Sequence, residues 1–114
     1  MFFPKNLLSA SAELTASAAT YYTSTNCKTL VTKVTIQNNG AAIRTVTFYL
    51  IKTGGAAGDT NKIVNGMSLG IGETVDITAL MGQILENGDF IQALADSAND
   101  VALFMSGIQI GLTS

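Results

Sequence analysis

The sequence predicts an all-β protein: a single antiparallel β-sandwich of the jelly-roll or immunoglobulin-like type, with about seven or eight short strands. Apolar and polar residues alternate with a period of two along most of the chain, which is typical of strands with one buried face. Segments rich in Gly, Asn and Asp, which favour turns, separate these runs. The 114 residues fit one domain, and 47% of them are hydrophobic, which is enough to fill its core.

The N-terminus does not follow the alternating pattern. We expect residues 1–12 to form a short arm outside the sandwich, and residues 13–114 to form the sandwich domain itself. Pro4, Lys5 and Asn6 interrupt the apolar residues of the arm, so it lacks the hydrophobic run of a secretory signal peptide. Apolar side chains on such an arm are costly to leave in water, and we assign them as candidate contacts with a partner: Phe2, Phe3, Leu7 and Leu8.

Residues 13–22 are predicted as an edge strand, although their alanine content leaves a short helix open. In an extended segment Tyr21 and Tyr22 point to opposite faces. One ring is then expected in the core and the other at the surface or in an interface. We therefore add Tyr22 to the candidate partner contacts.

An antiparallel hairpin is predicted for residues 30–37 and 44–52, because both segments alternate and are rich in β-branched residues. Asn38, Asn39 and Gly40 follow the first segment and tolerate the backbone angles of a turn. The apolar face of the hairpin must pack against a second layer. The residues expected on that face are Leu30, Val34 and Ile36 in the first strand and Val46, Phe48 and Leu50 in the second.

The remainder of the chain is predicted as short strands joined by loops. Residues 53–61 are rich in Gly and form a long flexible loop. Residues 78–85 lack alternation and space their apolar residues as a helix does, so we expect a helical or 3₁₀ crossover that closes one end of the sandwich. Gly107 indicates a β-bulge or a close approach of two backbones. Strands are expected over residues 62–64, 67–69, 73–77, 90–95 and 101–110, the last with Val101, Leu103 and Met105 on one side.

The residue types that are missing exclude several kinds of site. The chain has no His, so nucleophilic sites that depend on a His base cannot be built from it. Cys27 is the only Cys, which excludes an intrachain disulfide and a structural zinc site. We expect Cys27 to be a small, half-buried residue near a strand start. The sequence therefore predicts no catalytic residues, no metal and no cofactor, and the protein is not expected to be an enzyme.

The acidic residues in the second half of the sequence allow two other kinds of site, a glycosidase site and a calcium site, both of which we consider weaker interpretations. A paired-carboxylate glycosidase site needs two carboxyls across a sugar-binding cleft, for which the chain is too short. A calcium site would use loop oxygens, but the spacing of an EF-hand loop is absent. Asp in predicted turns more often binds its own backbone. The acids in question are Asp59, Glu86, Asp89, Asp96 and Asp100, with Asn99 as a further calcium ligand.

The charge and hydropathy of the sequence restrict the kinds of partner that the protein is expected to bind. The net charge is −2, with +4 on residues 1–53 and −6 on residues 54–114. If the folded chain separates these charges, head-to-tail association of copies is favoured. With a pI of 4.7 and no cluster of Lys or Arg, nucleic-acid binding is not expected. No apolar run is long enough to span a bilayer, so no membrane partner is expected.

Several segments of the chain form a recognisable pattern: Tyr21-Tyr22-Thr23, Lys28 to Ile36, Val46 to Leu50, Leu69-x-x-Gly72-Glu73, Leu85-x-x-Gly88-Asp89-x-Ile91-x-Ala93 and Ser106-Gly107. With these segments, over about residues 13–112, the chain resembles the small β-sandwich virion proteins of tailed bacteriophages, of the capsid decoration or cement type. The resemblance implies a structural protein that binds the outer surface of a phage capsid and ties neighbouring capsid subunits together. Its implied partners are the major capsid protein and further copies of itself, as a homodimer or homotrimer.

The expected location is the capsid surface of a virion assembled in the host cytoplasm. An apolar arm that extends onto a neighbour, or an exposed edge strand that pairs with one, is compatible with this role. The alternative is an accessory module of a tail or collar that binds a receptor or carbohydrate through loops at one end of the sandwich.

Overall fold

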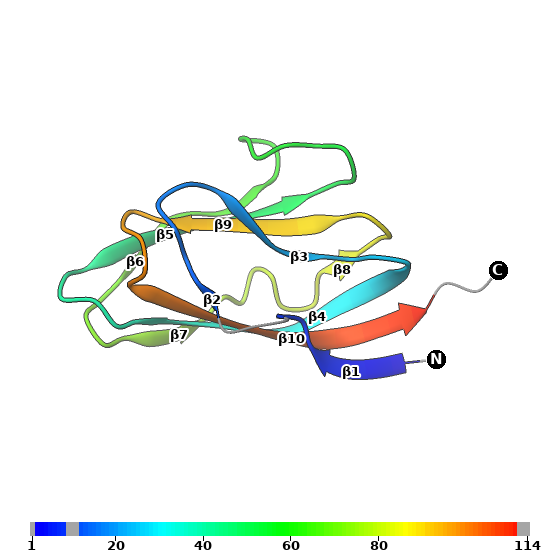
Figure 1. The fold of residues 1–114 in the computed structure, drawn as a ribbon, viewed down its shortest axis with the longest axis horizontal. Coiled ribbons are helices and arrows are strands. Elements are labelled where there is room, and N and C mark those ends of the chain that lie inside the picture. Colours follow the sequence, from blue (N-terminus) through cyan, green and yellow to red (C-terminus); the bar gives the residue numbers. More distant parts are fainter. Residues whose placement is uncertain (1, 9–11, 112–114) are drawn as a thin grey trace.

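A computed structural model describes residues 2–8 and 12–111, which form ten strands and no helix (Figure 1). Two antiparallel sheets pack face to face, which confirms the predicted all-β sandwich. Within these residues no helix is long and apolar enough to cross a membrane. The strands are β1 (Phe2–Asn6), β2 (Ala12–Glu13), β3 (Ala19–Thr23), β4 (Cys27–Asn38), β5 (Arg44–Ile51), β6 (Lys62–Leu69), β7 (Thr74–Asp76), β8 (Ile84–Leu85), β9 (Phe90–Ala95) and β10 (Val101–Gly111).

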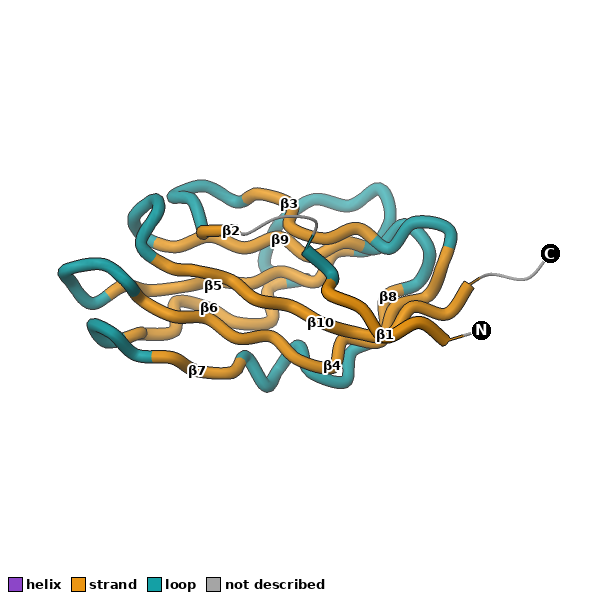
Figure 2. The backbone as a smooth tube through the Cα atoms, turned by 60° about the horizontal axis from the view of Figure 1, so that its bottom comes forward, coloured by secondary structure: helices purple, strands orange, loops and turns teal. Residues whose placement is uncertain are grey.

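The strands of both sheets run along the length of the molecule (Figure 2). Sheet A has six strands and sheet B has four. Sheet A has the order β1-β10-β4-β7. In it β2 also pairs with β10, on the side away from β4, and β8 also pairs with β4, on the side away from β10. Sheet B has the order β3-β9-β5-β6. Neighbouring strands within each sheet run antiparallel, and the core lies between the two sheets.

The predicted hairpin of residues 30–37 and 44–52 is wrong, because β4 lies in sheet A and β5 lies in sheet B. The chain between them crosses from one layer to the other. Asn38 holds this crossing: its buried side-chain amide donates to the carbonyls of Ala42, at 2.8 Å, and Leu69, at 3.1 Å. The two apolar faces therefore meet across the core instead of lying side by side in one sheet.

A β-bulge separates the two halves of the β4–β10 pair. Ser106 pairs with Lys33 but Gly107 pairs with Val31, so Thr32 is an extra residue in β4. Because the bulge reverses the alternation, Val31 is buried and Leu30 points away from the core. The bulge predicted at Gly107 is confirmed, and the inward position predicted for Leu30 is wrong.

The core draws its side chains from both sheets. Leu50 faces inward as predicted: it lies opposite the buried Ile91 of β9 and packs against the core, although its side chain is only half-buried. The other predicted inward residues are buried as expected: Val34, Ile36, Val46, Phe48, Val101, Leu103 and Met105.

The N-terminal segment does not lie outside the sandwich. Residues 2–6 form the edge strand β1, in which Phe2 pairs with Ile110 and Asn6 with Ser106. Leu7 follows with its N–H on the carbonyl of Met105, at 3.0 Å. The expected single strand over residues 13–22 is also wrong: its start, in β2, joins sheet A, and its end, in β3, is the edge of sheet B.

Residues 78–85 form neither an α-helix nor a 3₁₀ helix. Consecutive turns occupy residues 78–82, with an N–H to carbonyl bond of 3.1 Å from Met81 to Thr78. This segment runs along β4, where Gly82 donates to the carbonyl of Val31, at 2.7 Å, and Val31 donates to that of Gln83, at 3.0 Å. It therefore lies along the edge of sheet A and does not close an end of the sandwich.

Replacement of Gly107 by Ala should destabilise the sandwich. A Cβ there would lie 2.5 Å from the carbonyl oxygen of Leu30 and 3.1 Å from Cδ1 of Leu7, and the first of these atoms belongs to the backbone. We expect Gly107→Ala to lower the free energy of unfolding by about 2 kcal/mol or more, measured by urea denaturation. In the control Gly111→Ala the new Cβ meets open space, and the change should stay within about 0.5 kcal/mol. Equal effects of the two substitutions would contradict the prediction.

Candidate interaction surfaces

Two of the five predicted contact residues lie in the core. Leu7 and Tyr22 are buried, so they are not available to a partner in this fold, and Leu8 is half-buried against the core. The side chains of Phe2 and Phe3 lie outside the described part of the structure. The side chain of Leu7 occupies the space beside Gly107, which has no side chain of its own. This is why Leu7 is buried although it lies near the N-terminus.

Tyr22 is buried together with polar groups that satisfy its hydroxyl. The phenol oxygen lies 2.6 Å from Oγ1 of Thr29 and accepts a hydrogen bond from Nε2 of Gln109, at 2.7 Å. Ser24 continues the network, with its Oγ 2.9 Å from Oγ1 of Thr29. Cys27 is buried at the start of β4 beside these hydroxyls. Burial acts to raise the pKa of its thiol, but hydrogen bonds with Ser24, Thr29 and Tyr22 outweigh it and lower the pKa.

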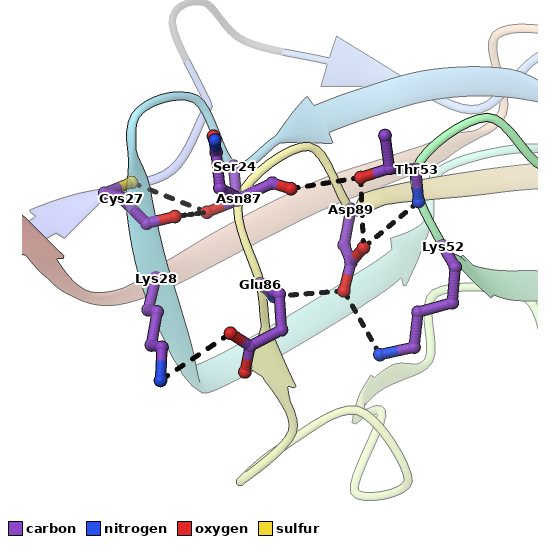
Figure 3. A network of polar contacts seen from close by, with 8 residues as sticks. All are labelled: Ser24, Cys27, Lys28, Lys52, Thr53, Glu86, Asn87 and Asp89. Carbon is purple, nitrogen blue, oxygen red and sulfur yellow. Dashed lines mark hydrogen bonds and ion pairs between the residues drawn. The ribbon is translucent and has the colours of Figure 1, made fainter. Parts of the chain in front are cut away.

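Asp89 joins the turn before β9 to the end of β5 (Figure 3). Its buried carboxylate accepts hydrogen bonds from the N–H of Glu86, at 3.0 Å, and of Thr53, at 3.1 Å, and from Nζ of Lys52, at 3.2 Å. Burial alone would raise the pKa of Asp89, but these bonds outweigh it and leave the pKa below its usual value. The geometry assigns Asp89 a structural role, as expected for Asp in a turn.

The other acids of the second half also bind neighbours within the chain. Asp100 lies 2.7 Å from Nε of Arg44, and Asp59 lies 3.5 Å from Nζ of Lys62. Asp96 accepts a hydrogen bond from the N–H of Thr45, at 3.2 Å. In residues 2–8 and 12–111, no three Asp, Glu or Cys side chains are grouped closely enough to hold a metal ion.

The outer face of sheet A carries an apolar row that crosses β1, β10, β4 and β8. Pro4 of β1 pairs with Ile108 of β10, Ile108 pairs with Leu30 of β4, and Leu30 pairs with Ile84 of β8. Phe104 lies further along β10 on the same face. Ile84 and Phe104 are 54% and 56% exposed. In an antiparallel sandwich the outward face is usually polar, so this row indicates an interaction surface.

Charged side chains on this face are paired with one another. Lys28 lies 3.6 Å from Glu86 beside the apolar row, and Lys33 lies 2.8 Å from Asp76 further along the strands. Hydrogen bonds from Lys33 and Thr35 lower the pKa of Asp76. Both lysines on the face are therefore neutralised within it.

A second surface lies at the left end of the sandwich in Figure 1, where three connections meet: residues 39–43, 70–73 and 96–100, here called the tip. The backbone of Asn38 binds that of Gly72, at 2.9 Å, and of Glu73, at 3.0 Å, and this holds the first two connections together. Ile43 and Ile71 project from them and are 61% and 63% exposed. The tip thus presents two apolar side chains on anchored loops.

Sequence reasoning missed these exposed residues, although the sequence contains signals for them. Phe104 alternates with the inward residues of the last strand, so its outward position follows from the period of two. Ile71 stands between two glycines in a turn, where the backbone is normally exposed. Ile84 and Leu30 carry no such signal, because their orientation depends on the bulge in β4.

Replacement of Asp89 by Asn should lower the free energy of unfolding by roughly 1–3 kcal/mol at neutral pH, because the amide cannot accept all the bonds that the carboxylate accepts. The carboxylate has a lowered pKa in the folded state. Its contribution is therefore present above the unfolded-state pKa of about 3.9 and is lost as the pH falls through the folded-state value. Urea unfolding at a series of pH values measures both effects. The control Asp76→Asn, at an exposed ion pair, should cost less; an Asp89→Asn effect that persists unchanged in acid would contradict the prediction.

Comparison with solved structures finds two matches. A structure of Bacillus endospore appendages, described as a novel family of disulfide-linked pili, is 16% identical, with 98% of this chain and 89% of that chain covered and a TM-score of 0.56. A structure of the infectious bursal disease virus Gt strain is 11% identical, with 97% of this chain and 30% of that chain covered and a TM-score of 0.28. No protein-family model and no curated protein matches the sequence. The chain is therefore a small all-β protein whose fold is similar to that of a bacterial pilus protein.

Proposed function

We propose that this chain is a structural virion protein that binds the outer surface of a phage capsid as a homo-oligomer and cements neighbouring capsid subunits. Its partners in this role are the major capsid protein and further copies of itself, and it has no catalytic role. The proposal is supported by the resemblance to phage decoration proteins, and by a fold similar to that of a pilus protein.

The observation that carries the proposal is the presence of two separate exposed apolar surfaces. The first is the outer face of sheet A, with Ile84 and Phe104, and the second is the tip, with Ile43 and Ile71. Extended apolar patches on a small protein usually mark contacts with other macromolecules. A cement protein needs at least two such contacts, because it must hold one neighbour while it binds another.

We assign the tip to the contact with the shell. Its apolar side chains stand on short connections that are anchored to the sandwich, so little conformational entropy is lost when they bind. The tip is also acidic: Glu73, Asp96 and Asp100 lie there, with Arg44 as their basic neighbour. An acidic tip favours a basic patch on the capsid surface.

The alternative, a carbohydrate-binding module of a tail or collar, would also use loops at one end. Its contact with a glycan would need polar groups placed to fix the sugar, together with aromatic side chains. The exposed large hydrophobic side chains at the tip are aliphatic. A glycan array separates the two roles, since the cement role predicts no specific glycan.

Substitution of both tip isoleucines should weaken capsid binding. We expect Ile43→Ser combined with Ile71→Ser to raise the apparent dissociation constant at least about tenfold, because apolar anchors at the centre of an interface carry much of its energy. Co-sedimentation with purified particles of the phage that encodes the chain measures this. The control Ala57→Ser changes an exposed residue of the loop at the opposite end and should bind normally. Wild-type protein that fails to sediment with the particles would refute the proposed function.

A further inference from the structure

We infer that the outer face of sheet A binds the same face of a second copy of this chain around a two-fold axis. The inference rests on the proposed function, which it deepens by assigning the surface and the partner of self-association. The contact is isologous, so the same residues serve both copies and the assembly closes at two.

The edges of the sheets are poor sites for a second copy. Pro4 stands in β1 and removes a backbone donor from that edge of sheet A, and residues 77–83 interrupt the opposite edge between β7 and β8. In sheet B, register shifts break the alternation in β6 and in β3, the two edge strands. Prolines, bulges and short strands are the features by which natural sheets avoid edge-to-edge pairing. Association of copies is therefore expected through a face.

The outer face of sheet A has the composition of such a contact. Its apolar row runs without interruption from Pro4 through Ile108 and Leu30 to Ile84. Phe104 lies on the same face further along β10, beyond the polar residues Asn6, Ser106 and Lys33, which pair with one another across the strands. These side chains come from strands, whose backbone is held by pairing on both sides in β4 and β10. The face is thus pre-organised, and ordering it on binding costs little entropy.

The size of the face matches what a stable dimer requires. Four strands about 4.8 Å apart give a width of about 19 Å, and the 11 residues of β10 at about 3.4 Å each give a length of about 37 Å. The face therefore covers at most about 700 Å² per copy, or about 1,400 Å² for two copies, because β1, β2, β7 and β8 are shorter than β10. Specific interfaces bury about 1,200–2,000 Å² in total.

Charge favours a second copy of this face over a strongly charged partner. Both lysines of the face are paired within it, Lys28 with Glu86 and Lys33 with Asp76. When two such faces meet, no unpaired lysines lie opposite each other. A basic or acidic partner surface would gain no binding energy from these lysines and acids, because they already form ion pairs within the face. This distinguishes the face from the acidic tip.

The test is the oligomeric state of the full chain, measured by analytical ultracentrifugation. Wild-type protein should be a dimer, and Ile84→Glu combined with Phe104→Glu should raise the dimer dissociation constant at least about 30-fold, because carboxylates would be placed in an apolar contact. Both residues are more than half exposed, so the monomer should keep its fold, which circular dichroism checks. Two matched controls should leave the dimer intact: Ile71→Glu at the tip, and Asn65→Lys on the β6 edge.

The outcomes separate this inference from the proposed function. A monomeric wild-type chain, or a dimer that survives both glutamates, would overturn the face-to-face contact. A dimer that is lost in Asn65→Lys would place the contact at the edge of sheet B and would also overturn it. Particle binding by a monomeric wild-type chain would leave the capsid contact standing without the dimer. A dimer that is dissociated by the two glutamates but binds no particle would support the face and refute the capsid role.

Discussion

The bulge between β4 and β10 decides which side chains the sandwich buries and which it presents. Thr32 is the extra residue, and Gly107 allows the two backbones to approach closely opposite it. On one side of the bulge Val34 and Ile36 face the core, and on the other Val31 does. The same reversal turns Leu30 outward, in line with Ile108 and Ile84. One local irregularity thus connects the packing of the core with the apolar row on the outer face.

Buried polar groups determine where the connections lie once the layers have packed. Asn38 binds the backbone of the connections at the tip, and Asp89 performs the same task at the opposite end of the sandwich. Within the described residues, no buried side-chain nitrogen or oxygen lacks a hydrogen-bond partner. Because an unpaired polar group in the core is costly, these contacts restrict each connection to one path. The tip is a defined surface for this reason.

The two exposed apolar surfaces differ in chemistry. The outer face of sheet A is broad, and its lysines are neutralised by acids on the same face. The tip is small and acidic, with Ile43 and Ile71 as its apolar residues. A neutral apolar face suits another copy of itself, and a charged tip suits a surface of opposite sign. Only 12% of the residues are charged. The charge of each surface therefore depends on where strand register and loop position place these few residues.

Alternation and turn residues are local signals, so they predict the all-β class, the strands β9 and β10, the bulge at Gly107 and most inward positions. The fold, and no local pattern, places β4 and β5 in different sheets and makes residues 2–6 an edge strand. Strand pairing depends on contacts between distant segments, which alternation does not specify. Leu7 was expected to be free for a partner for the same reason: the space that it fills exists only where Gly107 meets β4.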